Sequence, residues 1–333
     1  MKIMQIIENR KIEKKLRKEI MPGAWETIED MTGRTIIDKS SLSVKIEDMD
    51  HYIQGKCSGN KSIILNTVHA YSAYHSSKKE FYKWAYPLLV HEGYHYAQAH
   101  YEDKHIEGHD KFQPQTDKIG IMNKKQITKN RNIMIIMDEA PAYFIGAYAN
   151  SKIFAKEMNE LWQNRASLIR HKMISILCCF SENWKKELSA LFDMITNNEI
   201  SSIDEFRHGA YKEKSMGSSI ALIMFAANGY SILETMKDLD KPAAGIIDAL
   251  ARKLKNKEYS DAVKENVYEM AKIKIRIDKL YGKFESKEKN LLEESSDNKD
   301  FLKKLIKNQM QLKTSLIYKM RKETEAQKAE NRL

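Results

Sequence analysis

Residues 87–95 have the sequence Pro-Leu-Leu-Val-His-Glu-Gly-Tyr-His. The apolar run predicts a helix, on which His91 and His95, four residues apart, project from one face. Two imidazoles so placed can bind a single Zn²⁺. Glu92 follows His91 by about 100° around the helix, so its carboxylate can reach a water on the metal without binding the metal itself. We therefore expect His91 and His95 to be zinc ligands and Glu92 to be a general base.

The residues before this motif support a helix but leave its start open. Ser77-Lys-Lys-Glu80 has the spacing of a capping box, in which the serine side chain accepts a hydrogen bond from the first helical turn. Pro87 lacks a backbone N–H and disturbs a helix that passes through it. The sequence thus allows one distorted helix over 77–102, or a short helix over 77–85 followed by a second helix that starts at Pro87.

A catalytic zinc site needs a third protein ligand as well as an open position for water. Residues 133–143, Ile-Met-Ile-Ile-Met-Asp-Glu-Ala-Pro-Ala-Tyr, place carboxylates in an otherwise apolar helical stretch, and Glu139 lies 44 residues after His95. Burying a carboxylate is costly unless it is paired or bound to a metal. Glu139 is therefore the expected third ligand. Asp138 can accept a hydrogen bond from a ligand imidazole or can be a solvated side chain.

With these residues the chain resembles the gluzincin branch of the zincin metallopeptidases, in which a glutamate on a second helix completes the site begun by the HExxH motif. It looks most similar to uncharacterised bacterial families assigned as metallopeptidases from sequence, whose second motif, E-A-x-A, corresponds to Glu139-Ala140-Pro141-Ala142. The resemblance covers about residues 60–150, and Pro141 departs from its pattern. It implies that Ser62–Asn66 is the edge strand of a sheet, to which an extended peptide substrate adds as a further strand.

Other residues near the motif are weaker candidates for a metal site. The metzincin pattern requires a third histidine ten residues after His91, but Tyr101 occupies that position. His105 and His109 form a second pair at i and i+4, which allows either a second metal or two surface side chains. A deformylase-like or amidase activity is a further alternative because Cys57 lies upstream of the motif. The cysteine stands in a polar turn unlike the deformylase motif, so a peptidase is favoured.

The resulting mechanism is zinc-dependent hydrolysis of a peptide bond. Zinc lowers the pKa of a bound water, and Glu92 accepts a proton from this water and later transfers it to the departing amine. A hydrogen-bond donor should stabilise the oxyanion. The candidates for this role are Tyr143, one turn after Glu139, and His208 or Tyr211, each of which can equally be an ordinary packing residue.

Outside the motif, the chain is expected to be mainly α-helical, with an α+β zincin-like core. Only five prolines and 13 glycines occur in 333 residues, which suits a helical protein. Short β-like runs at 35–37, 43–46, 51–54 and 62–66 predict a small N-terminal meander of three or four strands, after a charged helix that ends at Pro22-Gly23. Helices are predicted at 77–102, 131–163, 164–181, 182–196, 203–212, 217–237, 242–256, 258–290 and 297–330.

Changes in composition divide the chain into four predicted segments. These are a charged N-terminal helix over 1–21, a zincin-like metallopeptidase core with the small sheet over 22–200, a helical extension over 201–257, and a basic helical hairpin or coiled coil over 258–333. Within the core, the polar stretch 103–130 connects two helices, and connections of this length are usually functional or disordered.

The positive charge of the chain is concentrated at its two ends. The net charge is +10, from 56 basic and 46 acidic residues; residues 1–20 carry +4, residues 251–333 carry +8, and the remainder carries −2. The zinc motif therefore lies in a nearly neutral region. Lysines interleaved with glutamates along the last helices are typical of a solvated face, so we do not expect nucleic acid to be the partner.

The number of cysteines and the sequence of the N-terminus indicate the cellular compartment in which the protein is expected. Three cysteines provide no disulfide framework, and the first 20 residues lack the uninterrupted apolar core of a signal peptide. The longest apolar stretch, Ile220–Ala227, is too short to span a bilayer. We therefore expect a cytoplasmic protein without a transmembrane segment, and the high content of lysine, isoleucine and asparagine suggests an AT-rich bacterial genome.

The alternative function belongs to a different class, that of a non-catalytic interaction protein. In this interpretation the HExxH motif is accidental and the helical C-terminal half of the chain is the functional part. The apolar positions of the hairpin 258–333 need to be covered, which a helical partner or a second copy of the chain can do. In this alternative the positive charge of the same helices also allows them to bind nucleic acid. The peptidase interpretation instead requires a protein or peptide substrate, with Zn²⁺ as the cofactor.

Overall fold

The computed structural model describes residues 2–50, 53–58, 61–101, 124–157, 165–178, 184–197, 210–241, 243–272 and 274–275. Within these ranges the protein is mostly helical and carries one small sheet, which confirms the predicted mainly α fold. The chain forms two compact units, Met1–Tyr268 and Glu269–Leu333. The four segments drawn from composition stay predictions, and most of the predicted C-terminal hairpin lies outside the described residues.

The chain begins with one long helical run. Helix α1 (Lys2–Lys15) passes through the π-helical turn η1 (Leu16–Ile20) into α2 (Met21–Thr32). The predicted helix end at Pro22-Gly23 is wrong, because Pro22 lies in the first turn of α2, where a missing backbone N–H is tolerated. The run ends at Gly33, whose φ of 68° is left-handed and closes the helix.

The sheet has the strand order β1-β3-β2, formed by β1 (Ser43–Glu47), β2 (Gly55–Ser58) and β3 (Ser62–Asn66). Strand β1 runs parallel to β3, and β2 runs antiparallel to it. This order overturns two predictions: the sheet is not a meander, and Ser62–Asn66 is its central strand rather than its edge. The buried run Ile63, Ile64 and Leu65 suits a central strand, because a strand covered on both faces is continuously apolar.

Two of the four predicted strands are confirmed, namely those at 43–46 and 62–66. The run at 35–37 contributes only an isolated bridge between Ile36 and Tyr101. The described part of 51–54 contains no strand, and β2 follows it directly. The residues of β2, Gly-Lys-Cys-Ser, read as a turn in the sequence, but pairing with β3 overrides their weak strand propensity.

Four of the helices predicted after the sheet, at 77–102, 164–181, 182–196 and 242–256, are confirmed within a few residues. The helix predicted over 203–212 lies mostly outside the described residues, and its last residues, 210–212, belong to α9 (Ala210–Ala227), while the helix predicted over 297–330 lies wholly outside them. Three further features differ. A helix over 67–76 was not predicted, and α6 begins inside the polar stretch 103–130. The single helix predicted over 217–237 is wrong, because Gly229 and Tyr230 adopt left-handed φ values of 57° and 61° and end the first part. The elements are η2 (Lys39–Ser41), α3 (Thr67–Ser76), α4 (Lys78–Gln98), α6 (Lys124–Glu157), α7 (Arg165–Leu177), α8 (Trp184–Asn197), α9 (Ala210–Ala227), α10 (Ile232–Leu239), α11 (Ala243–Lys253) and a helix over 257–272.

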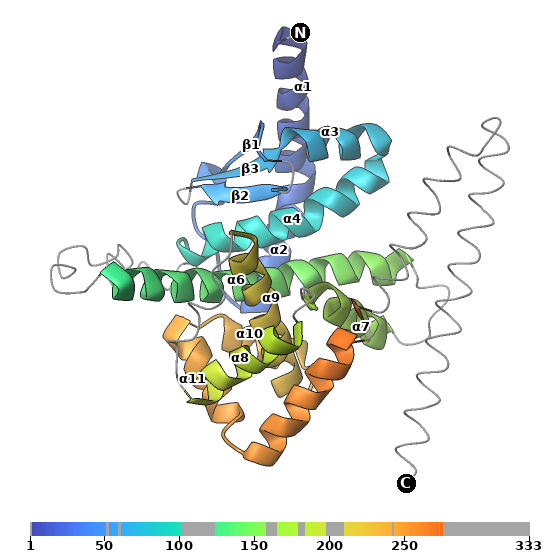
Figure 1. Ribbon diagram of the computed structural model, residues 1–333. Coiled ribbons are helices and arrows are strands. Elements are labelled where there is room, and N and C mark those ends of the chain that lie inside the picture. The colour runs from blue at the N-terminus through green and yellow to red at the C-terminus, as the bar shows by residue number, and fades with distance from the viewer. Residues whose placement is uncertain are drawn as a thin grey trace, which may run out of the picture. The chain divides into compact units, whose positions relative to one another are not determined.

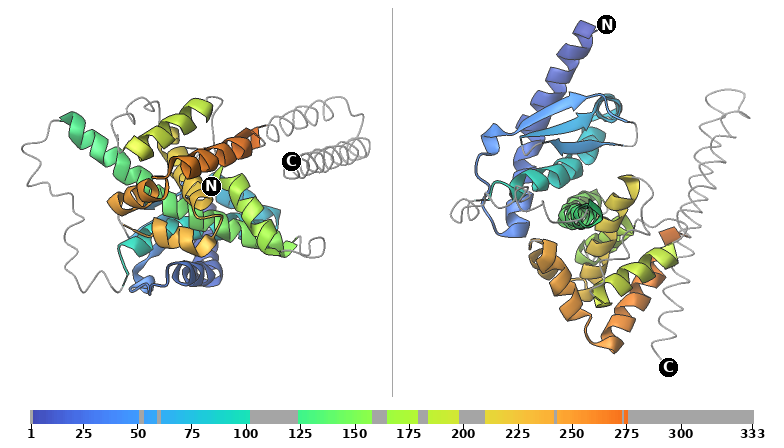
Figure 2. Two further views of the ribbon diagram at one scale, coloured as in Figure 1. Left: turned by 90° about the horizontal axis from the view of Figure 1, so that it is seen from below. Right: turned by 60° about the vertical axis from the view of Figure 1, so that its left-hand side comes forward.

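Helix α6 is the centre of the first unit. The right-hand view of Figure 2 looks nearly along α6, with the sheet and α1 to α4 on one side, α7, α8, α10 and α11 on the other, and α9 passing beside α6. Figure 1 shows α4 crossing above α6 and α9 crossing in front of it, and both helices pack against α6. A residue on α6 can therefore face either layer. Among the described helices, none has both the length and the apolar character needed to cross a membrane.

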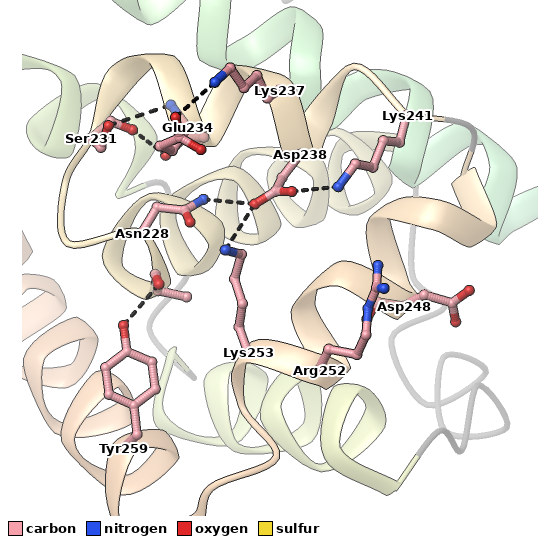
Figure 3. Close-up of polar contacts among 12 residues, drawn as sticks. Asn228, Ser231, Glu234, Lys237, Asp238, Lys241, Asp248, Arg252, Lys253 and Tyr259 are labelled. Atoms are coloured by element: carbon pink, nitrogen blue, oxygen red, sulfur yellow. Dashed lines mark hydrogen bonds and ion pairs between the residues drawn. The ribbon is translucent and has the colours of Figure 1, made fainter.

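A buried carboxylate joins the helices on the α9 side of α6. Figure 3 shows the side chains of Asn228, Lys241 and Lys253 converging on Asp238, at 3.1, 2.5 and 3.2 Å from its carboxylate oxygens. Burial alone would raise the pKa of Asp238, but hydrogen bonds from these three side chains outweigh it and lower the pKa below 3.8. The same cluster fixes the turn between α9 and α10 that sequence patterning missed.

We predict that Asp238→Asn destabilises the protein at neutral pH by about 1–3 kcal/mol, because charge-assisted hydrogen bonds are lost. A carboxylate with a depressed folded-state pKa stabilises the fold above its ordinary pKa of 3.8, and this stability disappears as the pH falls through the lowered value. The difference between wild type and variant should therefore shrink below pH 3.8. Urea unfolding across this range tests the prediction.

Glu234→Gln provides the control for this experiment. Glu234 is on the same helix and pairs with Lys237, but both side chains are more than half exposed, so their pairing contributes little. The control variant should unfold like the wild type at every pH. A loss of stability in Asp238→Asn that is equally large above and below the carboxyl pKa would contradict the assignment.

Candidate metal centre

The first half of the site comes from α4, which continues without a break through Pro87. The alternative of two separate helices is therefore wrong. The helix begins as the capping box predicts, since the Ser77 hydroxyl accepts a hydrogen bond of 3.0 Å from the Glu80 backbone N–H. His91 and His95 stand one turn apart on the same face, and their ring centroids are 5.1 Å apart.

The second half of the site comes from α6, which carries Glu139 to both histidines. One carboxylate oxygen of Glu139 lies 3.4 Å from Nε2 of His91, and the other lies 3.9 Å from Nε2 of His95. The three side chains are 13–15% exposed, so the cluster is largely but not completely shielded from solvent. The three residues predicted from the sequence to be ligands, His91, His95 and Glu139, thus lie together in the structure.

The spacing of these atoms fits a zinc ion. Two ligands that each bind a tetrahedral zinc at about 2.1 Å lie roughly 3.4 Å apart. The distances of 3.4 and 3.9 Å between Glu139 and the two imidazoles are close to this value, and the atoms that approach one another are the ones that bind metals. Two imidazoles and one carboxylate are also a donor set of catalytic zinc sites. The residues present therefore fit this metal.

The other predicted catalytic residues have different outcomes. Glu92 is 5% exposed, and its carboxylate and one ring nitrogen each of His91 and His95 form a group whose atoms are all within 4.8 Å of one another. The ring of Tyr143 stands edge-on to that of His91, with centroids 4.7 Å apart. His208 lies outside the described residues. The same holds for the side chain of Tyr211, although its backbone belongs to α9.

Asp138, next to Glu139 on α6, lies beside the ring of His95, on the side away from Nε2. Its Oδ2 atom lies 3.3 Å from Nδ1 of His95. This is the position of a carboxylate that orients a metal-binding imidazole and makes the ring more basic. Burial lowers the pKa of His95, but the nearby carboxylates of Asp138, Glu139 and Glu92 raise it more, to about 9. The carboxylates around His95 thus favour a positive charge on or beside its ring.

Two glycines allow the helices to meet at this point. A Cβ atom on Gly146 of α6 would lie 3.3 Å from Cβ of His91 and 3.4 Å from the Pro87 carbonyl oxygen, so α4 and α6 approach closely beside the first histidine. A Cβ atom on Gly217 of α9 would lie only 2.8 Å from Cβ of Glu139. Helix α9 therefore packs directly against Glu139. Neither glycine was predicted from the sequence; the available signal was a glycine inside the predicted helix 131–163 for Gly146, and a glycine at the start of the predicted helix 217–237 for Gly217.

The two residues of the motif between Glu92 and His95 hold α4 in place. A Cβ atom on Gly93 would lie 3.0 to 3.2 Å from side chains of α2, so that helix packs tightly here. The fully buried Tyr94 donates a hydrogen bond of 2.7 Å to Asp240, which also pairs with Arg34 at 3.2 Å. Burial and the nearby Asp240 carboxylate raise the pKa of Tyr94 well above 10.0. Thus His91 and His95 project toward the candidate metal site, whereas Gly93 and Tyr94 pack α4 against neighbouring parts of the fold.

Comparison with known proteins adds no further support. Neither a protein-family model, nor a curated protein, nor a solved structure matches the chain. The assignment of the site therefore depends on the geometry above. His105 and His109, the candidates for a second metal, lie outside the described residues. Cys57 lies in β2, not in the polar turn expected from the sequence.

We predict that Gly217→Ala destabilises the protein by about 1–3 kcal/mol, because the new methyl group forces α9 away from Glu139. The sign of this change in stability is informative, because replacing glycine by alanine inside a helix ordinarily stabilises the helix by about 1 kcal/mol. Urea unfolding measures the free energy of unfolding of both proteins. An equal or higher stability of the variant would mean that α9 does not pack against Glu139.

Gly23→Ala is the matched control. Gly23 lies in the first turn of α2, where a Cβ atom would meet only a Tyr86 ring carbon at the ordinary contact distance of 3.5 Å. The same substitution should therefore be neutral or slightly stabilising there. The opposite signs expected at the two positions separate helix propensity from the close approach at Glu139.

Proposed function

We propose that the protein is a zinc-dependent metallopeptidase of the gluzincin type. His91, His95 and Glu139 would hold the metal, and Glu92 would act as the general base. The supporting observation is the position of Glu139. This carboxylate belongs to a different helix and lies 44 residues from the motif, yet it faces the metal-binding nitrogens of both histidines. If the HExxH sequence occurred by chance, a carboxylate from another helix would not be expected beside both of its histidines.

The chemistry follows from the residues around the metal position. When bound, zinc would polarise a substrate carbonyl and lower the pKa of a water. Glu92, buried beside both imidazoles, accepts a proton from the attacking water and transfers it to the departing amine. Tyr143, beside His91, is the described candidate for stabilising the oxyanion. Asp138 keeps the ring of His95 oriented.

The first test is the zinc content of the purified full-length protein. We expect about one zinc per chain, and we expect Glu139→Gln to lower zinc affinity by on the order of 100-fold or more, because it removes a charged ligand. Inductively coupled plasma mass spectrometry gives the content, and competition with a chromogenic chelator gives the affinity. A wild-type protein that stays free of metal under zinc-replete conditions would contradict the proposal.

Glu157→Gln is the control for this test. Glu157 is also on α6 but pairs with Lys79 and Lys83, at 2.9 and 2.8 Å, away from the histidines. The substitution makes the same chemical change on the same helix. It should leave zinc affinity unchanged. Equal losses of zinc in both variants would show that Glu139 acts through the stability of α6 and not as a ligand.

The second test separates catalysis from metal binding. Glu92→Gln should keep its zinc but lose about 10²- to 10⁴-fold in kcat on a quenched-fluorescence peptide library, because the base that moves the proton is absent. Glu80→Gln, at an exposed position of the same helix, should retain full activity. If Glu92→Gln cleaves peptides as fast as the wild type, the zinc is structural and the proposed reaction is wrong.

A further inference from the structure

A second candidate site lies at the start of the chain, between the first helical run and the sheet. It is a partly open pocket of about 350 Å³, which is within the size range of small-molecule sites. One wall is the strand residue Val44, and the rest comes from α1 and η1. The lining side chains are Arg10, Glu13, Lys14, Arg17, Lys18 and Val44.

The helical residues of this pocket form one stripe. Arg10, Lys14, Arg17 and Lys18 occur at i, i+4, i+7 and i+8, which places them on a common helix face. Two of them belong to the π-helical turn η1, a rare structure that is common at functional sites. Lys15 shows the contrast, because it points elsewhere and lies 5.1 Å from the ring centroids of both Tyr74 and Phe81.

The pocket carries a strong excess of positive charge. Its four cationic side chains are exposed, and within the described part of the chain none of them forms an ion pair. Like charges on successive helical turns repel one another, so an anion in the pocket would stabilise them. Glu13 is the only acidic residue of the lining, and its Oε1 atom already accepts a hydrogen bond of 2.9 Å from the Ile46 backbone N–H.

The same contact limits what can enter. Strand β1 is an edge strand, but Glu13 binds the Ile46 N–H, and the Asn9 amide donates to the Ile46 carbonyl at 3.2 Å. Side chains of α1 therefore satisfy this part of the edge, and an incoming peptide strand cannot pair there. The pocket is thus suited to a compact anion and not to an extended chain.

We propose that this pocket binds the phosphate groups of a small molecule. The planar guanidinium groups of Arg10 and Arg17 donate paired hydrogen bonds to phosphate oxygens, and the ammonium groups of Lys14 and Lys18 add charge. Four cations and one carboxylate leave a charge of +3 in the lining, which matches a ligand with two or more phosphates. The site is separate from the zinc ligands, none of which lines the pocket.

The test uses pyrophosphate as the probe and isothermal titration calorimetry on the full-length chain in about 150 mM salt, where exposed charges are largely screened. We expect saturable binding of one pyrophosphate per chain, and a loss of roughly tenfold or more in affinity in Arg10→Gln/Arg17→Gln. The matched control Lys11→Gln/Arg252→Gln removes two positive charges outside the pocket and should bind like the wild type. Circular dichroism and zinc content should be the same in all three proteins.

Three results would overturn the proposal. The first is an absence of saturable pyrophosphate binding to the wild type. The second is an equal loss of affinity in the control variant, which would show that total charge and not the pocket is responsible. The third is binding of a larger polyanion, either a single-stranded oligonucleotide or phosphatidylglycerol vesicles, that pyrophosphate does not displace. If Arg10→Gln/Arg17→Gln weakens this binding, the residues form a surface for polyanions and not a site for a small molecule.

Discussion

Helices α4 and α6 cross at the point where the carboxylate of Glu139 faces the imidazoles of His91 and His95. Glu92 and Asp138 bring two further carboxylates to the same place, and Glu92 is almost fully buried. The carboxylates of Glu92 and Glu139 are mostly buried, so they repel one another, lose hydration and require positive charge beside them. The proposed zinc ion meets this electrostatic demand and explains why polar side chains converge at the centre of an apolar helix interface.

The rest of the fold can be understood as support for this crossing. Gly146 removes the side chain that would separate α6 from His91, and Gly217 lets α9 pack directly behind Glu139. Tyr94, inside the motif, reaches in another direction to Asp240 at the end of α10. Metal geometry tolerates errors of only about 0.2 Å, which a single helix cannot guarantee. Two helices held from both sides by close packing can do so, and this explains the large helical body around a small site.

The parts of the structure that sequence could predict are those with a local signal. The histidine pair depends only on helical periodicity, the start of α4 depends on Ser77, and Glu139 stood out as a charge in an apolar stretch. The sheet order failed because pairing between distant segments decides it, as in β2. The close contacts at Gly146 and Gly217 also depend on neighbours that are distant in sequence. Local patterns therefore identified the residues that form this cluster but not the packing that brings them together.

The central proposal, a zinc ion held by two imidazoles and one carboxylate, is tested most directly by X-ray absorption at the zinc edge of the full-length protein. We predict a first shell made only of nitrogen and oxygen at about 2.0–2.1 Å, with the outer-shell scattering of two histidines. In Glu139→Gln this spectrum should be lost or altered while the helical content stays the same. A shell that contains sulfur at about 2.3 Å, or a wild-type spectrum without histidine scattering, would contradict this assignment of the ligands.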